Sequence, residues 1–324
     1  LDLSLARIRE ALQVVRQHNI QLMLGFNRRF DANFMKLKAL VDAGVNIVAV
    51  VTAPDKPAGR GMQLQQPPVK KFAVEHQIPV LQPTKLKAPE FIKELKSYQA
   101  DLQVVIAFRM LPEAVWNMPR LGTINLHASL LPDYRGAAPI NWAIINGETE
   151  TGVSTFLLKH EIDTGDLIHQ QKVDITPEMT AGELHDVLMH VGADLIVKTV
   201  KAVESGNYSP APQKEAQNKT APKIFTEHCL INWHQSGAKV KNLIRGLSPY
   251  PGAFTKINEQ ILKIYNCTFE SGVHQEILGT MQTETGKTPY IRFAVADGWI
   301  YATDVQLQGK KRMKVEDLLR GWRN

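Results

Sequence analysis

Three residues with side chains suited to acyl transfer stand in one stretch of the chain and in a short motif after it. Asn125 carries a carboxamide that can donate hydrogen bonds to a developing oxyanion, and His127 can carry a proton. Asp163 begins an Asp-Thr-Gly-Asp motif and supplies a carboxylate that can orient or charge the imidazole. On a strand, Asn125 and His127 point to the same face because one residue separates them. The pattern predicts a site for acyl transfer.

Each of these residues has a plainer interpretation when it is taken singly. Asn125 can satisfy backbone groups at a strand end, His127 can be a structural histidine, and Asp163 can belong to a turn. The combination favours catalysis, because further motifs accompany them in a fixed order. These motifs are Ser129-Leu-Leu-Pro132, Arg135-Gly136 and Asp163-Thr-Gly-Asp166.

The length and composition of the chain limit which classes of protein it can belong to. The chain has 324 residues, of which 44% are apolar and 22% charged, enough for two globular domains. No run of about 18 apolar residues and no basic segment with a following apolar one is present, so neither a membrane span nor a secretory signal is expected. Cys229 and Cys267 exclude a disulfide framework, and no cluster has metal-ligand spacing. The chain is predicted to be cytoplasmic and to hold no metal.

The positive charge is unevenly spread along the sequence. Residues 1–205 carry 22 Lys and Arg against 22 Asp and Glu, whereas residues 206–324 carry 16 against 10. The net charge of +6 therefore lies in the last third, which favours a polyanionic partner there. An ordinary solvated surface is the alternative.

Apolar strands alternate with amphipathic helices from residue 36 onward. This rhythm predicts an α/β fold, a doubly wound and mostly parallel sheet of Rossmann-like type with helices on both faces. Asn125 and His127 fall at the carboxyl end of one strand, where sites lie in such sheets. The predicted strands are Val45–Thr52, Ile78–Leu81, Leu102–Phe108 and Gly122–His127, and the predicted helices are Leu37–Gly44, Pro68–His76, Ala88–Tyr98 and Thr180–Ser205.

The alternation of strands and helices ends at residues 206–222. This segment is polar and rich in proline, which is typical of a linker. Beyond it, residues 233–246 predict one helix. Short strands follow at 253–257, 262–265 and 299–303. Short strands at close spacing predict a small antiparallel barrel, and an oligonucleotide-binding (OB-like) barrel suits the basic charge.

The motifs around Asn125, His127 and Asp163 resemble the folate-dependent formyltransferase family. The resemblance implies 10-formyltetrahydrofolate as formyl donor and an amine as acceptor. It assigns Asn125 and His127 to the formyl oxygen, and Asp163 to the imidazolium and to proton removal from the amine. The segments that it places along the folate are Ser129, Leu130, Leu131 and Pro132, and Phe108, Arg109, Met110 and Leu111.

Within that family, residues from about 35 to 324 resemble the methionyl-tRNA formyltransferases. The loop Ala53-Pro-Asp-Lys-Pro-Ala-Gly-Arg-Gly61 is similar to the one that these enzymes insert at the acceptor end of the tRNA. The resemblance implies methionyl initiator tRNA as partner, translation initiation as the process, and a monomer. The residues that it directs toward RNA are Lys56, Arg60, Lys223, Lys310, Lys311 and Arg312.

The opening segment departs from this resemblance. Residues 1–34 resemble an interior piece of the inositol dehydrogenase-like oxidoreductases, through residues 11–18 and 25–31. The family's usual first strand and Gly-Thr-Pro loop are absent, and we expect Ile20–Phe26 to pair as a surrogate first strand. The predicted parts are a foreign segment 1–34, a catalytic domain 35–205, a linker 206–222 and a tRNA-binding domain 223–324.

Two other functions stay open at this point. A sugar-nucleotide formyltransferase shares the catalytic motif, although the basic second domain and the 53–61 loop speak against it. An inactive tRNA-binding hybrid would result if the replaced first strand disabled the folate domain. A dehydrogenase is the weakest alternative, because the opening segment carries no dinucleotide fingerprint.

Overall fold

The computed structural model describes residues 21–26, 32–58, 63–106, 110–214 and 219–321. The chain divides into two compact units. The first unit holds residues 1–133, 152–173 and 186–218, and the second holds residues 134–151, 174–185 and 219–324. Segments of the two units therefore alternate along the sequence. No helix in the described part of the chain is long and apolar enough to cross a membrane.

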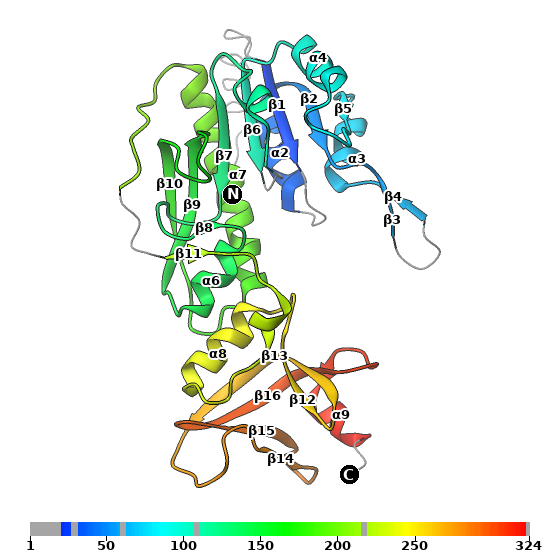
Figure 1. Ribbon diagram of the computed structural model, residues 1–324, viewed down its shortest axis with the longest axis vertical. Coiled ribbons are helices and arrows are strands. Elements are labelled where there is room, and N and C mark those ends of the chain that lie inside the picture. The colour runs from blue at the N-terminus through cyan, green and yellow to red at the C-terminus, as the bar shows by residue number, and fades with distance from the viewer. Residues whose placement is uncertain (1–20, 27–31, 59–62, 107–109, 215–218, 322–324) are drawn as a thin grey trace, which may run out of the picture. The chain divides into compact units, whose positions relative to one another are not determined.

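The first unit is built on a seven-stranded sheet with the order β10-β9-β7-β6-β1-β2-β5 (Figure 1). Neighbouring strands from β7 to β5 run parallel, whereas β7 and β9 run antiparallel. This arrangement confirms the predicted, mostly parallel sheet. The strands are β1 (Gln21–Phe26), β2 (Asn46–Thr52), β5 (Val80–Leu81), β6 (Leu102–Ile106), β7 (Thr123–His127), β9 (Glu150–Leu157) and β10 (Leu167–Asp174).

An interior strand of this sheet, β1, comes from the opening segment. β1 pairs in parallel with β2 on one side and with β6 on the other. Its register with β6 runs without a break from Leu22 opposite Leu102 to Phe26 opposite Ile106. Both rows of backbone donors and acceptors along β1 are thereby used. The expectation that residues 20–26 supply a first strand is confirmed.

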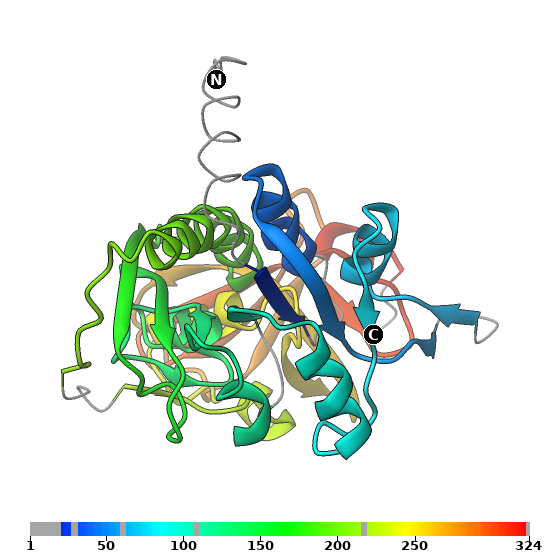
Figure 2. The same ribbon diagram turned by 90° about the horizontal axis from the view of Figure 1, so that it is seen from above.

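Helices cover both faces of the sheet (Figure 2). One face carries α2 (Ala32–Asp42), α3 (Pro68–Glu75) and α7 (Ala181–Glu204), and the other carries α4 (Pro89–Ser97) and α5 (Glu113–Trp116). Successive residues of a strand point to opposite faces, so β2 contributes Val50 to the first core and Ala49 and Val51 to the second. The sheet is doubly wound, as the alternation of strands and helices predicts.

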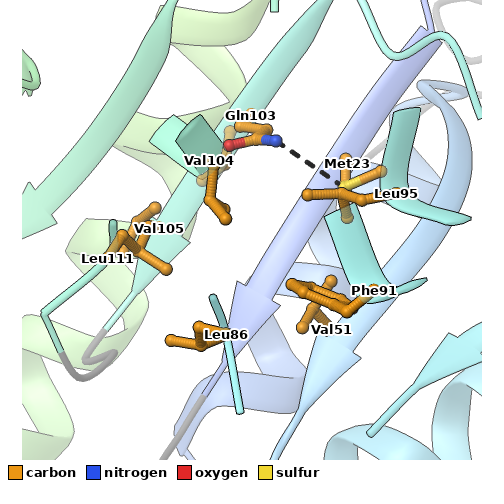
Figure 3. Close-up of a pocket in the computed structure, with 10 residues that line it drawn as sticks. Met23, Val51, Leu86, Phe91, Leu95, Gln103, Val104, Val105 and Leu111 are labelled. Carbon is orange, nitrogen blue, oxygen red and sulfur yellow. Dashed lines mark hydrogen bonds between the residues drawn. The ribbon is translucent and has the colours of Figure 1, made fainter. Parts of the chain in front are cut away.

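A small cavity of about 20 Å³ lies in the core between α4 and the sheet (Figure 3). The buried amide of Gln103 lies at its wall, donating to Sδ of Met23 at 3.8 Å and accepting from the Thr123 hydroxyl at 3.2 Å. The remaining lining is apolar. A space of this size has room for about one water molecule, so it is a packing gap rather than a ligand site.

The second unit contains an antiparallel sheet with the order β12-β13-β16-β15-β14, and β17 pairs with β16. This sheet confirms the predicted antiparallel second domain. The strands are β12 (Ala253–Ile257), β13 (Gln260–Ser271), β14 (Met281–Glu284), β15 (Tyr290–Val295), β16 (Gly298–Leu307) and β17 (Met313–Lys314), and the helices are α6 (Pro139–Ile145), α8 (Gly237–Gly246) and α9 (Val315–Arg320).

The core of this sheet packs against α8. Val240 and Ile244 of the helix belong to the same buried cluster as Trp233 and Phe293, whose rings stack at 4.4 Å. Helix α8 begins at Gly237 rather than at the predicted Trp233, because the Ser236 hydroxyl caps it by accepting from the backbone N–H of Lys239.

One charged side chain is buried just beyond the opening segment. Lys36 on α2 is 7% exposed, and its Cε lies 3.5 Å from where a side chain on Gly192 of α7 would begin. Burial lowers the pKa of Lys36 to about 8 because the charged form loses its hydration. Keeping the Lys36 ammonium charged in the folded protein at pH 7 therefore costs on the order of 3 kcal/mol.

Replacing Lys36 by Met should raise the free energy of unfolding at pH 7 by about 1–3 kcal/mol, because Met keeps the unbranched stem without the charge. The unfolded lysine binds its proton up to about pH 10.5, whereas the folded one releases it from about pH 8. Wild-type stability therefore rises through this window, and the advantage of Lys36→Met shrinks there. Urea unfolding at pH 7 and pH 10 measures both effects.

Lys38→Met is the matched control on the same helix, because Lys38 is exposed and pairs with Asp42. It should change stability by less than about 0.5 kcal/mol. Equal effects of the two variants at pH 7 would contradict the buried charge.

Candidate active site

The predicted imidazole and carboxylate meet at the end of β7. Nδ1 of His127 lies 3.8 Å from Oδ2 of Asp163, and their side chains are 8% and 10% exposed. This separation is that of an ion pair rather than of a direct hydrogen bond. In such a protected place a carboxylate stabilises an imidazolium more strongly than it does in water.

Asn125 lies two residues earlier on the same strand. Its backbone is held on both sides, by Val105 of β6 and by Phe156 of β9. The strand alternation places Asn125 and His127 on one face, and Asn125 is half-buried. The structure thus brings an amide donor to the same strand end as the His127–Asp163 pair.

The Ser129-Leu-Leu-Pro132 segment is held in place through Ser154 of β9. The Ser154 hydroxyl donates to the carbonyl of Ser129 at 2.6 Å and accepts from the N–H of Leu131 at 3.1 Å. Gln170 of β10 donates to the Leu131 carbonyl at 2.9 Å and to the Ser154 hydroxyl at 2.8 Å. Every hydrogen-bonding site of the Ser154 hydroxyl is used, so this side chain fixes the backbone of the segment.

Ser129 itself is fully buried, and its hydroxyl donates to the carbonyl of Asp133 at 2.6 Å. Its side chain therefore shapes the turn. Sequence reasoning missed Ser154 and Gln170. A polar pair, Ser154-Thr155, between the apolar residues Val153 and Phe156 was the signal available.

The turn that presents Asp163 is tightly packed. Asp163 has a φ of +56°, in the left-handed region. A Cβ on Gly165 would lie 1.6 Å from the carbonyl oxygen of Leu157, so only glycine fits there. The amide of Gln213 donates to the carbonyls of both Asp163 and Gly165 at 2.8 Å. Sequence reasoning placed Gln213 in a linker and assigned it no role.

Two family models match successive parts of the chain. A formyl transferase model matches residues 21–200, and a formyl transferase C-terminal domain model matches residues 223–323. The chain belongs to the formyl transferase family. The first match begins at the start of β1, so it includes the strand that sequence analysis assigned to the foreign segment.

Relatives in this family cover nearly the whole chain. The methionyl-tRNA formyltransferase of Bacteroides fragilis is 52% identical over 295 residues, which are 88% of this chain and 90% of that protein. The methionyl-tRNA formyltransferase of Flavobacterium johnsoniae is 47% identical over 290 residues, 88% and 91% of the two chains.

Solved structures with lower identity show the fold. An N-formyltransferase of Helicobacter canadensis, in complex with folinic acid and dTDP-3-aminofucose, has a TM-score of 0.63 and 19% identity over 87% of this chain and 98% of its own. HypX of Aquifex aeolicus in complex with tetrahydrofolic acid has a TM-score of 0.62 and 20% identity, over 93% of this chain and 47% of its own.

The structure describes only part of the loop that follows β6. Phe108 and Arg109, which the resemblance directs toward folate, lie outside the described residues. Met110 is 77% exposed, and Leu111 reaches back to the wall of the core cavity (Figure 3).

The loop that the resemblance directs toward RNA follows β2. β3 (Lys56–Ala58) and β4 (Gln63–Gln65) form a hairpin that stands away from the sheet (Figures 1 and 2). Arg60 and the Lys56 side chain lie outside the described part. The base of the hairpin is anchored by Asp55, which accepts from Gln82 at 2.8 Å and from Lys70 at 2.6 Å. These two hydrogen bonds lower the pKa of Asp55.

The basic residues of the second unit differ in their surroundings. Lys223 is exposed, with its ammonium 5.2 Å from the centre of the Phe225 ring, and Lys310 and Lys311 are also exposed. Arg312 instead makes a two-point pair with Asp304 at 2.9 and 2.7 Å, and these hydrogen bonds raise its pKa. Its guanidinium is already engaged by a carboxylate.

The second unit is less basic than the sequence suggests. It includes residues 134–151 and 174–185, which bring five carboxylates and one arginine, so it holds 16 Lys and Arg against 14 Asp and Glu. Its net charge is +2 rather than +6. An RNA interface there must rest on particular exposed lysines rather than on overall charge.

One of these carboxylates lies close in sequence to the Arg135-Gly136 motif, within the second unit. β8 (Arg135–Gly136) pairs with β11 (Thr220–Ala221), and a Cβ on Gly136 would lie 2.4 Å from the Ala221 carbonyl oxygen. Beside this pair, Glu148 accepts from Tyr134 at 2.6 Å and Lys219 at 2.8 Å. Burial alone would raise the pKa of Glu148, but these two partners outweigh it and lower the pKa.

No group of three His, Cys, Asp or Glu side chains among the described residues is placed to hold a metal ion.

Replacing Gly165 by Ala should lower the free energy of unfolding by about 1–3 kcal/mol, because the added methyl overlaps the Leu157 carbonyl and must displace the turn. Chemical denaturation measures the change. Gly272→Ala is the matched control, since nothing lies within 4 Å of its added methyl. If both variants were as stable as the wild type, the tight turn at Gly165 would be refuted.

Proposed function

We propose that this protein transfers the formyl group of 10-formyltetrahydrofolate to the α-amine of methionyl initiator tRNA, which prepares that tRNA for translation initiation. The proposal is supported by sequence similarity and site geometry taken together. Relatives named methionyl-tRNA formyltransferase are about half identical over nearly nine tenths of the chain, and Asn125, His127 and Asp163 meet at one strand end.

The donor set at this strand end suits a formyl group. The folate supplies the formyl carbon, bound to its N10 nitrogen. The amide of Asn125 and a protonated His127 can donate to the formyl oxygen as negative charge develops on it. Asp163 lies where it stabilises the imidazolium. No metal is needed for this chemistry, because these hydrogen-bond donors replace a Lewis acid.

The proton balance assigns a second task to Asp163 and His127. The amine forms a bond to the formyl carbon and gains positive charge, so it must lose a proton. The bond from the formyl carbon to N10 then breaks, and that nitrogen must gain a proton. The Asp163 carboxylate can take the first proton, directly or through water. The His127 imidazolium can give a proton to N10, and Asp163 then returns its proton to His127.

The folate itself would lie along the Ser129-Leu-Leu-Pro132 segment and the strand-end loop that includes residues 108–111. In the first of these, Ser154 and Gln170 occupy the Ser129 carbonyl and the Leu131 backbone groups, and the Ser129 hydroxyl bonds to Asp133, so we expect the segment to present the Leu130 side chain. The RNA would meet the 53–61 loop and the exposed lysines Lys223, Lys310 and Lys311.

The deciding experiment offers the purified chain 10-formyltetrahydrofolate together with either charged initiator tRNA or a nucleotide-linked amino sugar. Formylation of the tRNA alone supports the proposal. Formylation of the sugar alone would replace it with the sugar-nucleotide alternative. Binding of tRNA without transfer to either acceptor would identify an inactive hybrid.

Replacing Asn125 by Ala should lower kcat by ~100- to 1000-fold, because one donor to the developing oxyanion is lost. His127→Ala should abolish turnover. In both variants, calorimetric binding of tetrahydrofolate should persist, since neither side chain is needed to hold the pterin. Asn117→Ala, at an exposed helix end, is the control for a lost asparagine. Full activity of Asn125→Ala would remove this residue from the mechanism.

The double variant Lys310→Glu/Lys311→Glu should weaken tRNA binding and reduce its salt dependence. Losing two phosphate contacts lowers the slope of log Kd against log salt by about 1.4–1.8, because fewer counterions are released. Lys93→Glu/Lys96→Glu reverses the same number of exposed charges on α4 and is the matched control. If both double variants give the wild-type slope, Lys310 and Lys311 lie outside the RNA footprint.

A further inference from the structure

The segment that follows α7 is attached to the first unit rather than free. Within residues 206–214, the backbone of Ala211 both donates to and accepts from Leu167 of β10, at 2.9 and 2.8 Å. This pair adds a short antiparallel bridge to the strand. Two residues later the chain reaches Gln213, which is half-buried between exposed neighbours.

Gln213 makes a two-point contact with the turn that carries Asp163. Its side-chain nitrogen has two hydrogens, and it lies 2.8 Å from the carbonyl oxygen of Asp163 and 2.8 Å from that of Gly165. Both hydrogens are therefore directed at the backbone of one turn.

The geometry of the turn leaves its backbone little freedom. A partner that binds its carbonyl groups therefore holds one conformation. Asp163 has a left-handed backbone, and Gly165 lies against the end of β9 without room for a side chain. Within the turn, the Thr164 hydroxyl donates to the Glu161 carbonyl at 3.1 Å. The carbonyls of Asp163 and Gly165 point toward Gln213. Their hydrogen bonds fix the rotation of the peptide units 163–164 and 165–166.

We propose that Gln213 is a positioning residue for Asp163. By holding both carbonyls of the turn, it keeps the Asp163 carboxylate at its ion-pair distance from His127. This inference rests on the proposed role of the His127–Asp163 pair. Gln213, which sequence analysis placed in a linker, would thus contribute to the reaction through the Asp163 side chain.

The first test reads the geometry without any reaction. The ring carbon Cε1–H resonance of His127, assigned by comparison with a His127→Ala sample, is followed by NMR in the full chain. Gln213→Ala should shift this resonance in the same direction as Asp163→Asn does. Gln171→Ala is the matched control, because that exposed side chain of β10 bonds only to the Lys172 carbonyl. An unmoved His127 resonance in Gln213→Ala would overturn the inference.

The second test is a double-mutant cycle on formyl transfer. Gln213→Ala should lower kcat by ~10- to 100-fold, the effect of a small misplacement, while KM for folate and for tRNA stays within about twofold. In the Asp163→Asn background, Gln213→Ala should cause no further loss, because the carboxylate that it positions is already absent. An equal loss in both backgrounds would mean that Gln213 acts on general structure.

A second variant guards against a change in folding. Gln213→Glu keeps the size of the side chain but places a carboxylate against two carbonyl oxygens, so its kcat should fall at least as far as that of Gln213→Ala. Thermal unfolding of each variant shows whether the fold persists. If the wild type transfers no formyl group, the proposed function fails, and the NMR comparison still decides whether Gln213 positions Asp163.

Discussion

The pairing of β1 between β2 and β6 is the constraint on which the remaining structure depends. β6 holds β7 in register, and β7 carries Asn125 and His127. If the middle position were vacant, β2 and β6 would each expose a row of unpaired backbone groups, and the two cores on either face would open. Strand pairing uses the backbone alone, so a segment with an unrelated sequence can fill this position when its length and apolar content suit it.

The site itself is organised by side chains that stand outside its motifs. Ser154 and Gln170 hold the Ser129–Pro132 segment, and Gln213 holds the turn of Asp163. In each case a polar side chain from a different element satisfies backbone groups of an irregular segment. Irregular backbone near a buried ion pair needs such partners, because an unsatisfied carbonyl or N–H there is costly. The motif residues supply the reactive groups, and these supports set where the groups lie.

Much of the fold followed from local patterns in the sequence, whereas the supports did not. Apolar periodicity predicted β2, β6 and β7 and the helices α3 and α4 between β2 and β6, and one-residue spacing placed Asn125 and His127 on a common face. The inclusion of residues 134–151 and 174–185 in the second unit escaped prediction, because it depends on contacts distant in sequence. Gln213 escaped it for the same reason: fifty residues separate it from Asp163, and its neighbours have the composition of a linker.

The contact between Met23 and Gln103 bears on how the sheet tolerates a change of sequence in β1. Methionine is unbranched and polarizable, so it adapts to a surface that was not shaped for it. Here it meets a buried amide beside a gap the size of a single water molecule. A more rigid β-branched residue at this position would demand a matching hollow in α4 and β6. The packing between β1 and β6 is thus compliant at Met23, so the sequence around it can change before the packing is refined.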